Sequence, residues 1–282
     1  RPLAHAHAFG YRAAPWPREG RAAGSAVWPH RKARMSKLTK FVRSWWLRRR
    51  IRYEDLPLET FVTPLEKGEP YSFTRFGDGE WYAILGDPGA NADGHQYFPQ
   101  LGADLRRTME QPLPYRYGMQ PSVMGLDGLR IRRYLEGAGV TVPWCNANVF
   151  HYANRDGELF PLVRALRAHR IVMIGPAHLR PLDGVVFPVA RFIEIPALNC
   201  YLDMDRVRGE VADEAGRGTG TVFAFAASMM TNVIVHDLFP QFGTRHWMLD
   251  FGSVLDVYAG VQSRSVYRDL DWSKAIARNL GN

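Results

Sequence analysis

From residue 54 to residue 265, short runs of β-branched and aromatic residues alternate with stretches of helical spacing, and Gly or Pro ends each run. The runs predict strands at residues 71–76, 170–174, 192–195, 221–226 and 246–249. The stretches between them predict helices at residues 81–85, 101–111, 128–136, 159–168, 204–215 and 229–238. Strands that alternate with helices build a largely parallel sheet covered on both faces, so we expect an α/β fold with a single Rossmann-like domain.

The positive charge of the chain is concentrated before this domain. Residues 1–53 hold 14 Lys and Arg residues against one acid, Glu19, whereas the remaining 22 basic and 27 acidic residues give the rest of the chain a net charge of −5. Residues 1–34 show no hydrophobic period and contain no methionine, so we expect a disordered or non-native extension before a natural start at Met35. We expect residues 266–282 to form a C-terminal tail.

Residues 35–53 predict a basic amphipathic helix. Seven basic residues and no acidic ones accompany its apolar residues, which include Leu38, Phe41, Val42, Trp45, Trp46 and Leu47. Three roles are open for the helix: packing of its aromatic side on the domain, peripheral contact of residues 37–53 with an anionic membrane surface, and contact with nucleic-acid phosphates. Nucleic acid is the least favoured partner, because the folded body has no basic stripe or recognisable binding motif.

The sequence favours a cytoplasmic protein, with the inner face of the membrane as the place of any peripheral contact. Cys145 and Cys200 lie far apart in the sequence and are not spaced as zinc ligands, so we expect two reduced, buried thiols. No apolar run approaches the roughly 20 residues required to span a bilayer.

The turn after the first predicted strand of the domain carries the strongest chemical signal. Gly77 and Gly79 flank Asp78 and let the backbone approach a ligand closely, while Asp78 and Glu80 can both turn toward one hard cation. Arg75 supplies a planar fork suited to phosphate. These residues predict an Mn²⁺ or Mg²⁺ ion that bridges the phosphates of a nucleotide diphosphate. An ordinary turn, with Glu80 as a favourable acid at a helix N-terminus, is the alternative.

Two further loops follow predicted strands, where ligands bind in sheets of this kind. Gly175 and Pro176 end one strand, and His178 after them is a candidate contact for base, phosphate or acceptor. A strand-ending turn explains the same residues without a ligand. Ser228 precedes a predicted helix, where it can bind phosphate, cap the helix, or do both.

The run Arg-Phe-Gly-Asp-Gly-Glu at residues 75–80 resembles the signature of the GT-D type glycosyltransferases, a bacterial family first catalogued as a domain of unknown function. Residues 193–203 resemble the family's Ile-x-x-Pro-x-x-Asn-Ala segment, and residues 222–258 resemble its closing strand, helix, strand and Asp-x-Gly turn. The resemblance implies that Asp78 and Glu80 hold a divalent metal with the nucleotide diphosphate. It also places Asp250 and Ser253 in the donor site.

The chain departs from the family pattern in two places. Ala-Ala-Ser-Met at residues 226–229 replaces Gly-Pro-Thr-Ala, and Ser253 and Asp256 follow the Asp-x-Gly turn where many members have a His and acids. Asp256 is therefore the candidate catalytic base, with an ordinary surface acid as the alternative.

The predicted activity is that of a hexosyltransferase, which moves a hexose from a nucleotide diphosphate sugar, foremost a UDP-sugar, to a hydroxyl acceptor such as a glycan or glycoprotein. A metal-dependent hydrolase of nucleotide sugars or phosphate esters is the second hypothesis, although two-metal hydrolases use more clustered His and Asp ligands than this sequence has. The third is a membrane- or nucleic-acid-binding adaptor that acts through the basic N-terminus. The net charge of −5 on the body argues against it.

Overall fold

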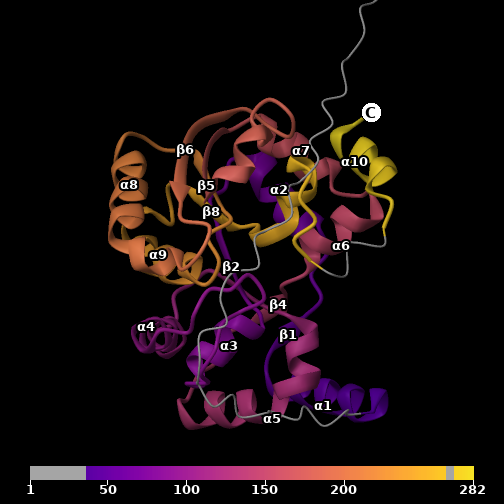
Figure 1. Ribbon diagram of the computed structural model, residues 1–282, viewed down its shortest axis with the longest axis vertical. Coiled ribbons are helices and arrows are strands. Elements are labelled where there is room, and N and C mark those ends of the chain that lie inside the picture. The colour runs from indigo at the N-terminus through magenta and orange to yellow at the C-terminus, as the bar shows by residue number, and fades with distance from the viewer. Residues whose placement is uncertain (1–35, 265–269) are drawn as a thin grey trace, which may run out of the picture. The chain divides into compact units, whose positions relative to one another are not determined.

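The computed structural model describes residues 36–264 and 270–282, so the extension expected at residues 1–34 lies outside the described residues. Ser36–Asn282 form one compact unit. Its centre is a sheet of eight parallel strands in the order β1-β4-β3-β2-β8-β7-β5-β6 (Figure 1). The expected α/β fold with a largely parallel sheet is confirmed.

Five strands correspond to the predicted runs, and three short ones were not predicted. The predicted strands are β2 (Ser72–Phe76), β5 (Arg170–Pro176), β6 (Val189–Ile195), β7 (Thr221–Phe225) and β8 (Trp247–Asp250). The others are β1 (Tyr53–Glu54), β3 (Arg116–Met119) and β4 (Trp144–Asn146). These three strands have two to four residues each, too few for a hydrophobic period to stand out.

Helices connect the strands and cover the sheet. They are α1 (Lys37–Arg50), α2 (Glu59–Lys67), α3 (Asp78–Ile84), α4 (Pro99–Glu110), α5 (Pro121–Gly137), α6 (Val149–Asp156), α7 (Phe160–Arg167), α8 (Met204–Gly216), α9 (Met230–Phe242) and α10 (Trp272–Leu280). Three 3₁₀ segments join them: η1 (Ala177–Leu182), η2 (Cys200–Asp203) and η3 (Gly252–Ala259).

Alternate residues of the strands point to opposite faces of the sheet. In β5, Ile171 and Met173 are buried in a cluster with α2, α6, α7 and α10, whereas Val172 and Ile174 are buried in a cluster with α8 and α9. A third cluster packs α1, α3, α4 and α5 against the half of the sheet that contains β2, β3 and β4. Because side chains alternate across a strand, burial on both faces requires the continuous apolar runs that marked these strands in the sequence.

The C-terminal segment is packed on the domain, although the sequence predicted a tail at residues 266–282. In α10, Trp272 is buried, and the buried side chain of Asn279 accepts a hydrogen bond from the Leu159 amide at 2.8 Å. The Asn279 amide group donates to the Asn154 carbonyl oxygen at 2.8 Å. This helix was not predicted although five of its nine residues are apolar, because helical spacing is recognised over about 11 to 18 residues and this helix is shorter.

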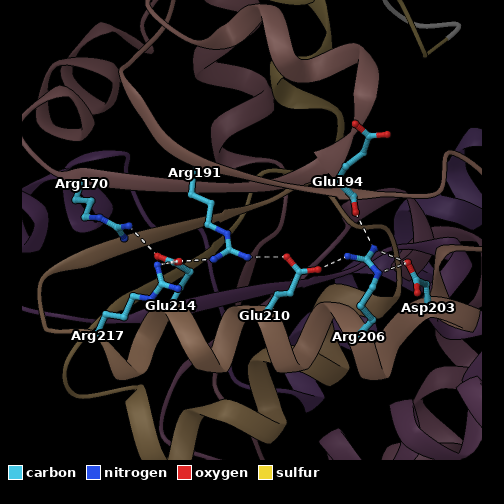
Figure 2. A network of polar contacts seen from close by, with 8 residues as sticks. All are labelled: Arg170, Arg191, Glu194, Asp203, Arg206, Glu210, Glu214 and Arg217. Atoms are coloured by element: carbon cyan, nitrogen blue, oxygen red, sulfur yellow. Dashed lines mark hydrogen bonds and ion pairs between the residues drawn. The ribbon is translucent and has the colours of Figure 1, made fainter.

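An ion-pair network fastens α8 to the edge of the sheet (Figure 2). The Glu214 carboxylate is buried and lies within 2.7 Å of the guanidinium groups of Arg170, Arg191 and Arg217. Glu210 extends the network from Arg191 along α8. Burial favours the neutral acid, but the hydrogen bonds from Arg170 and Arg191 outweigh it and lower the pKa of Glu214. The network is structural, since it connects β5, β6 and α8 to one another.

The predicted basic helix is present as α1, and Ser36 caps its N-terminus: the Ser36 side chain accepts a hydrogen bond from the Thr39 amide. Leu47 is buried against α5 and Trp46 is half-buried. The idea that the aromatic side of this helix packs on the domain is wrong for Phe41 and Trp45, whose side chains are exposed. Among the described residues, no helix is long and apolar enough to cross a membrane.

Candidate active site

A pocket of about 1040 Å³ lies at the carboxyl ends of the strands. Residues that follow β2, β3, β4, β5, β6, β7 and β8 all line it, among them Gly77, Gln120, Ala147, His178, Pro196, Ala226 and Gly252. From β2 the chain continues to β3 and β4 on one side, whereas β8, β7, β5 and β6 lie on the other. The pocket therefore occupies the switch point of the sheet, where open α/β sheets bind ligands.

Ten of the eleven residues predicted for the site line this one pocket. They are Arg75, Gly77, Asp78, Gly79, Glu80, Pro176, Ser228, Asp250, Ser253 and Asp256. The exception is Gly175, which is buried inside β5. A Cβ atom on Gly175 would lie 2.9 Å from Leu179 Cδ1, so this glycine makes room for a core leucine.

Asp78 and Glu80 lie in the first turn of α3, which begins three residues earlier than predicted. Glu80 Oε2 accepts a hydrogen bond from the Gly77 amide at 2.7 Å and so closes the helix N-terminus. Glu80 thus has the capping role that the ordinary-turn alternative anticipated, while Asp78 is exposed in the pocket. Burial, together with the charge of Asp250, raises the pKa of Glu80 to about 7.

Arg75 and Asp250 join the ends of β2 and β8. The Arg75 guanidinium lies 3.3 Å from Asp250 Oδ1, and its Nε has no hydrogen-bond partner among the described residues. Burial raises the pKa of Asp250 even though Arg75 opposes the shift. Gly252 is essential to this contact: its φ is +49°, and a Cβ atom there would lie 1.7 Å from an Arg75 nitrogen.

The two glycines around Asp78 make room for other side chains of the pocket. A Cβ atom on Gly77 would lie 2.6 Å from Gln120 Oε1, and one on Gly79 would lie 3.1 Å from Asn91 Cβ. From the sequence, both glycines are expected to let the backbone approach a ligand. The packing around Gly77 and Gly79 favours glycine at both positions even without a ligand.

Ser228 does not cap α9. That helix begins at Met230 and has no side-chain cap, whereas the Ser228 hydroxyl accepts a hydrogen bond from Asn91 Nδ2 at 3.0 Å. Ser228 also adopts a φ of +51°, an uncommon conformation for a residue with a side chain. Such conformations are concentrated at functional sites, where the surrounding structure holds them in place.

Several pocket residues gave no signal in the sequence. Asp93 forms an ion pair with Arg264 at 2.7 Å, and Arg264 also donates to the Ser253 hydroxyl. His151 lies in the pocket, where burial, followed by the positive charges of Arg75 and Arg264, holds its pKa well below the ordinary value. These residues come from irregular segments and a short helix that only the fold brings to the switch point.

His178 and Asp256 meet in this pocket although 78 positions separate them. His178 Nε2 lies 3.1 Å from Asp256 Oδ1, and Asp256 also accepts a hydrogen bond from the Ser263 hydroxyl. The Asp256 side chain is only 7% exposed, whereas that of His178 is 37% exposed. His178 is therefore the member of the pair that a bound molecule can reach.

The charge of the pocket fits a divalent cation shared with a phosphate ligand. Five carboxylates line it against three guanidinium groups: Asp78, Glu80, Asp93, Asp250 and Asp256 against Arg75, Arg155 and Arg264. Within residues 36–264 and 270–282, no group of three or more His, Cys, Asp or Glu side chains is arranged to hold a metal alone. Mg²⁺ is commonly held by one or two carboxylates together with substrate phosphates, which is the kind of site that Asp78 and Glu80 can offer.

A parallel α/β sheet with a polar pocket at its switch point is the arrangement in which open α/β folds bind their ligands. Two solved structures are similar to this chain, each with a TM-score of 0.56 and 15% sequence identity over 78% of this chain and 84% of the other. Both are of the domain of unknown function 1792, one of them selenomethionine-substituted, and this domain is described as having a distinct glycosyltransferase fold. Neither a protein-family model nor a curated protein sequence matches the chain. The chain has this glycosyltransferase fold, as its resemblance to the GT-D type had implied.

Proposed function

We propose that this protein is a glycosyltransferase that moves a hexose from a nucleotide diphosphate sugar to a hydroxyl acceptor, with Mn²⁺ or Mg²⁺ as cofactor. The observation that carries the proposal is the convergence of Arg75, Asp78, Glu80 and Asp250 at the switch point of a glycosyltransferase fold. A UDP-sugar is the first donor to test.

In this proposal Asp78 and Glu80 hold the metal together with the donor diphosphate. A divalent ion held by these two carboxylates would neutralise the charge that develops on the leaving diphosphate. The charge of Arg75 acts on Glu80, and its guanidinium lines the same pocket with 16% of the side chain exposed, so it can donate to the same phosphates. Asp250 keeps the guanidinium in place through the 3.3 Å contact.

The proposed acceptor base is His178, with Asp256 as its positioning residue. With the Nε2 hydrogen donated to Asp256, the lone pair on Nδ1 can take the proton of the acceptor hydroxyl. The acceptor oxygen bonds to the anomeric carbon, the bond from that carbon to the diphosphate breaks, and the nucleoside diphosphate leaves. Asp256, predicted as the base itself, acts here through the more exposed histidine.

Calorimetric titration of UDP and UDP-sugars, with and without Mn²⁺, tests the donor site without knowledge of the acceptor. We expect metal-dependent binding that Asp78→Asn abolishes. Asp87→Asn is the matched control, because Asp87 lies just beyond the other end of α3, outside the pocket, and pairs with Arg130. Absence of nucleotide diphosphate binding in the presence of Mn²⁺ would refute the proposal and leave a shared fold only.

The base is tested by the rate of UDP release from a bound UDP-sugar, with water or soluble alcohols as acceptors. His178→Gln should lower kcat by about 10²- to 10⁴-fold while leaving UDP affinity unchanged. Asp256→Asn should also lower kcat with UDP affinity unchanged, since the imidazole loses the carboxylate that positions it at 3.1 Å. A His178→Gln variant with the kcat of the parent protein would exclude His178 as the acceptor base. Sugar release that never responds to an added acceptor would instead favour the hydrolase hypothesis.

A further inference from the structure

The outer side of α1 carries an unusual apolar stripe. Leu38, Phe41, Val42 and Trp45 are 71%, 67%, 51% and 47% exposed. Their spacing of three, four and seven residues places them on one side of a helix. The opposite side faces α5: Lys40 lies against Gly125, and Leu47 is buried against Gly128. A surface helix normally turns its apolar side toward the core, so α1 has the reverse orientation.

The contact with α5 is close enough to fix this orientation. A Cβ atom on Gly125 would lie 3.2 Å from the Lys40 carbonyl oxygen, and one on Gly128 would lie 3.5 Å from Leu47 Cδ2. The two glycines thus let the backbones of α1 and α5 approach each other, and the helices lie side by side (Figure 1). Rotation of α1 to bury its apolar stripe would expose Leu47 and lose this packing.

The charge around the stripe is of one sign. Helix α1 has six basic residues and no acid. Within the part of the chain that the structure describes, Lys37, Lys40, Arg49 and Arg50 form no ion pair. The Arg49 guanidinium lies 4.4 Å from the centre of the Trp45 ring, so cationic and aromatic groups share the outer surface.

We infer that this face of α1 binds the surface of an anionic lipid bilayer. Apolar and aromatic side chains enter the headgroup region, where indole rings are favoured, and the flanking cations bind lipid headgroups. A second copy of the chain fits less well, because two such helices would bring like charges together. Nucleic acid fits less well, because exposed Leu, Phe and Val side chains gain little from a phosphate backbone. The inference stands apart from the proposed activity, since no pocket residue takes part.

The test is flotation of the full chain with vesicles of phosphatidylcholine alone and of phosphatidylcholine with phosphatidylglycerol. We expect binding to the anionic vesicles that weakens as salt is raised. Phe41→Ser/Trp45→Ser should reduce vesicle partition by at least about tenfold, because it removes two aromatic side chains from the apolar stripe. Leu198→Ser/Leu202→Ser is the matched control and should leave partition unchanged, since exposed Leu202 lies in η2 and exposed Leu198 just before it, away from α1 in the sequence.

Fluorescence gives a second readout that does not depend on loss of binding. Trp45→Phe should keep vesicle affinity but reduce the blue shift of tryptophan emission, because Trp45 is the more exposed of the two tryptophans in α1. Three results would overturn the inference: no binding to anionic vesicles, equal loss of binding in the Leu198/Leu202 variant, or full binding by the Phe41/Trp45 variant. Self-association that the Phe41/Trp45 substitutions abolish, without vesicle binding by the parent protein, would assign the face to a second copy.

Discussion

Replacement of Gly252 by Ala should damage the pocket through Arg75. The new Cβ atom would lie 1.7 Å from an Arg75 nitrogen, so the guanidinium must leave Asp250. An alanine held at a φ of +49° costs about 1 kcal/mol, and removal of one partner from a buried ion pair costs about 3 kcal/mol. The free energy of unfolding should therefore fall by about 4 kcal/mol at neutral pH, an upper value because the backbone can relax.

The pH dependence separates these two contributions. Without Arg75, the buried Asp250 carboxyl retains its proton to higher pH, so its pKa in the folded state rises further above the ordinary value of 3.8. A raised folded-state pKa for an acid means that stability falls as pH increases above the unfolded-state pKa. The deficit of Gly252→Ala should therefore be small near pH 4 and grow toward neutral pH.

Urea denaturation of Gly252→Ala between pH 4 and pH 8, with Gly260→Ala as control, measures both effects. Gly260 has a φ of +74°, and no atom would lie within 4 Å of a Cβ atom there. Its replacement should cost only the backbone contribution of about 1 kcal/mol, at every pH. Equal destabilisation of the two variants at neutral pH, or a pH-independent deficit in Gly252→Ala, would refute the role assigned to Gly252.

Three further predictions concern the scaffold. Glu214→Gln should lower the free energy of unfolding by about 3 kcal/mol at neutral pH. The loss should be smaller below about pH 4, because the lowered pKa of Glu214 stabilises the folded state only where its carboxyl is ionised. Glu210→Gln removes a more exposed carboxylate and should cost under about 1 kcal/mol; urea denaturation of both variants measures these losses. Leu47→Ala should cost about 3 kcal/mol by the same assay, because Leu47 is fully buried between α1 and α5. Cys145 and Cys200 are buried, and burial raises the pKa of each thiol to about 12. A thiol reagent should therefore modify them only at the rate of unfolding. Rapid modification of the native protein would contradict this prediction.

The sequence predicted the elements whose own residues carry a long apolar signal. β5 and β7 are buried on both faces, and their continuous apolar runs were recognised. β3 contains Arg116 and a glycine within four residues and acquires its strand character from the parallel neighbours β2 and β4. Gly118 is needed there because a Cβ atom would lie 2.9 Å from the Phe73 ring, a packing requirement that no local pattern reveals.

The same distinction applies to the pocket. Arg75, Asp78 and Glu80 follow one another in the sequence, so the motif could be recognised before the fold was known. Arg264 gave no such signal, and His178 was a candidate contact whose pairing with Asp256 could not be recognised in that way. Arg264 pairs with Asp93, 171 positions away, and His178 pairs with Asp256 across two loops. Contacts of this kind depend on the strand order of the sheet, which the hydrophobic pattern does not specify.

Helix α5 connects the pocket with the proposed membrane face. Ser122 in its first turn lines the pocket, and Gly125 and Gly128 hold α1 in place. Ser122 and Gly128 are six positions apart in the helix, a rise of about 9 Å along its axis. If α1 binds a lipid surface and the pocket transfers sugar, α5 holds the reaction centre near that surface.

Acceptors embedded in the bilayer would then gain effective concentration at the pocket, while small soluble acceptors would not. Anionic vesicles should accordingly accelerate transfer to a lipid-linked acceptor, and Phe41→Ser/Trp45→Ser should remove that acceleration without changing transfer to a soluble alcohol. If anionic vesicles accelerate transfer equally in the parent protein and in this variant, the acceleration does not depend on the apolar stripe of α1. Sugar transfer by the pocket would then be independent of membrane binding by α1.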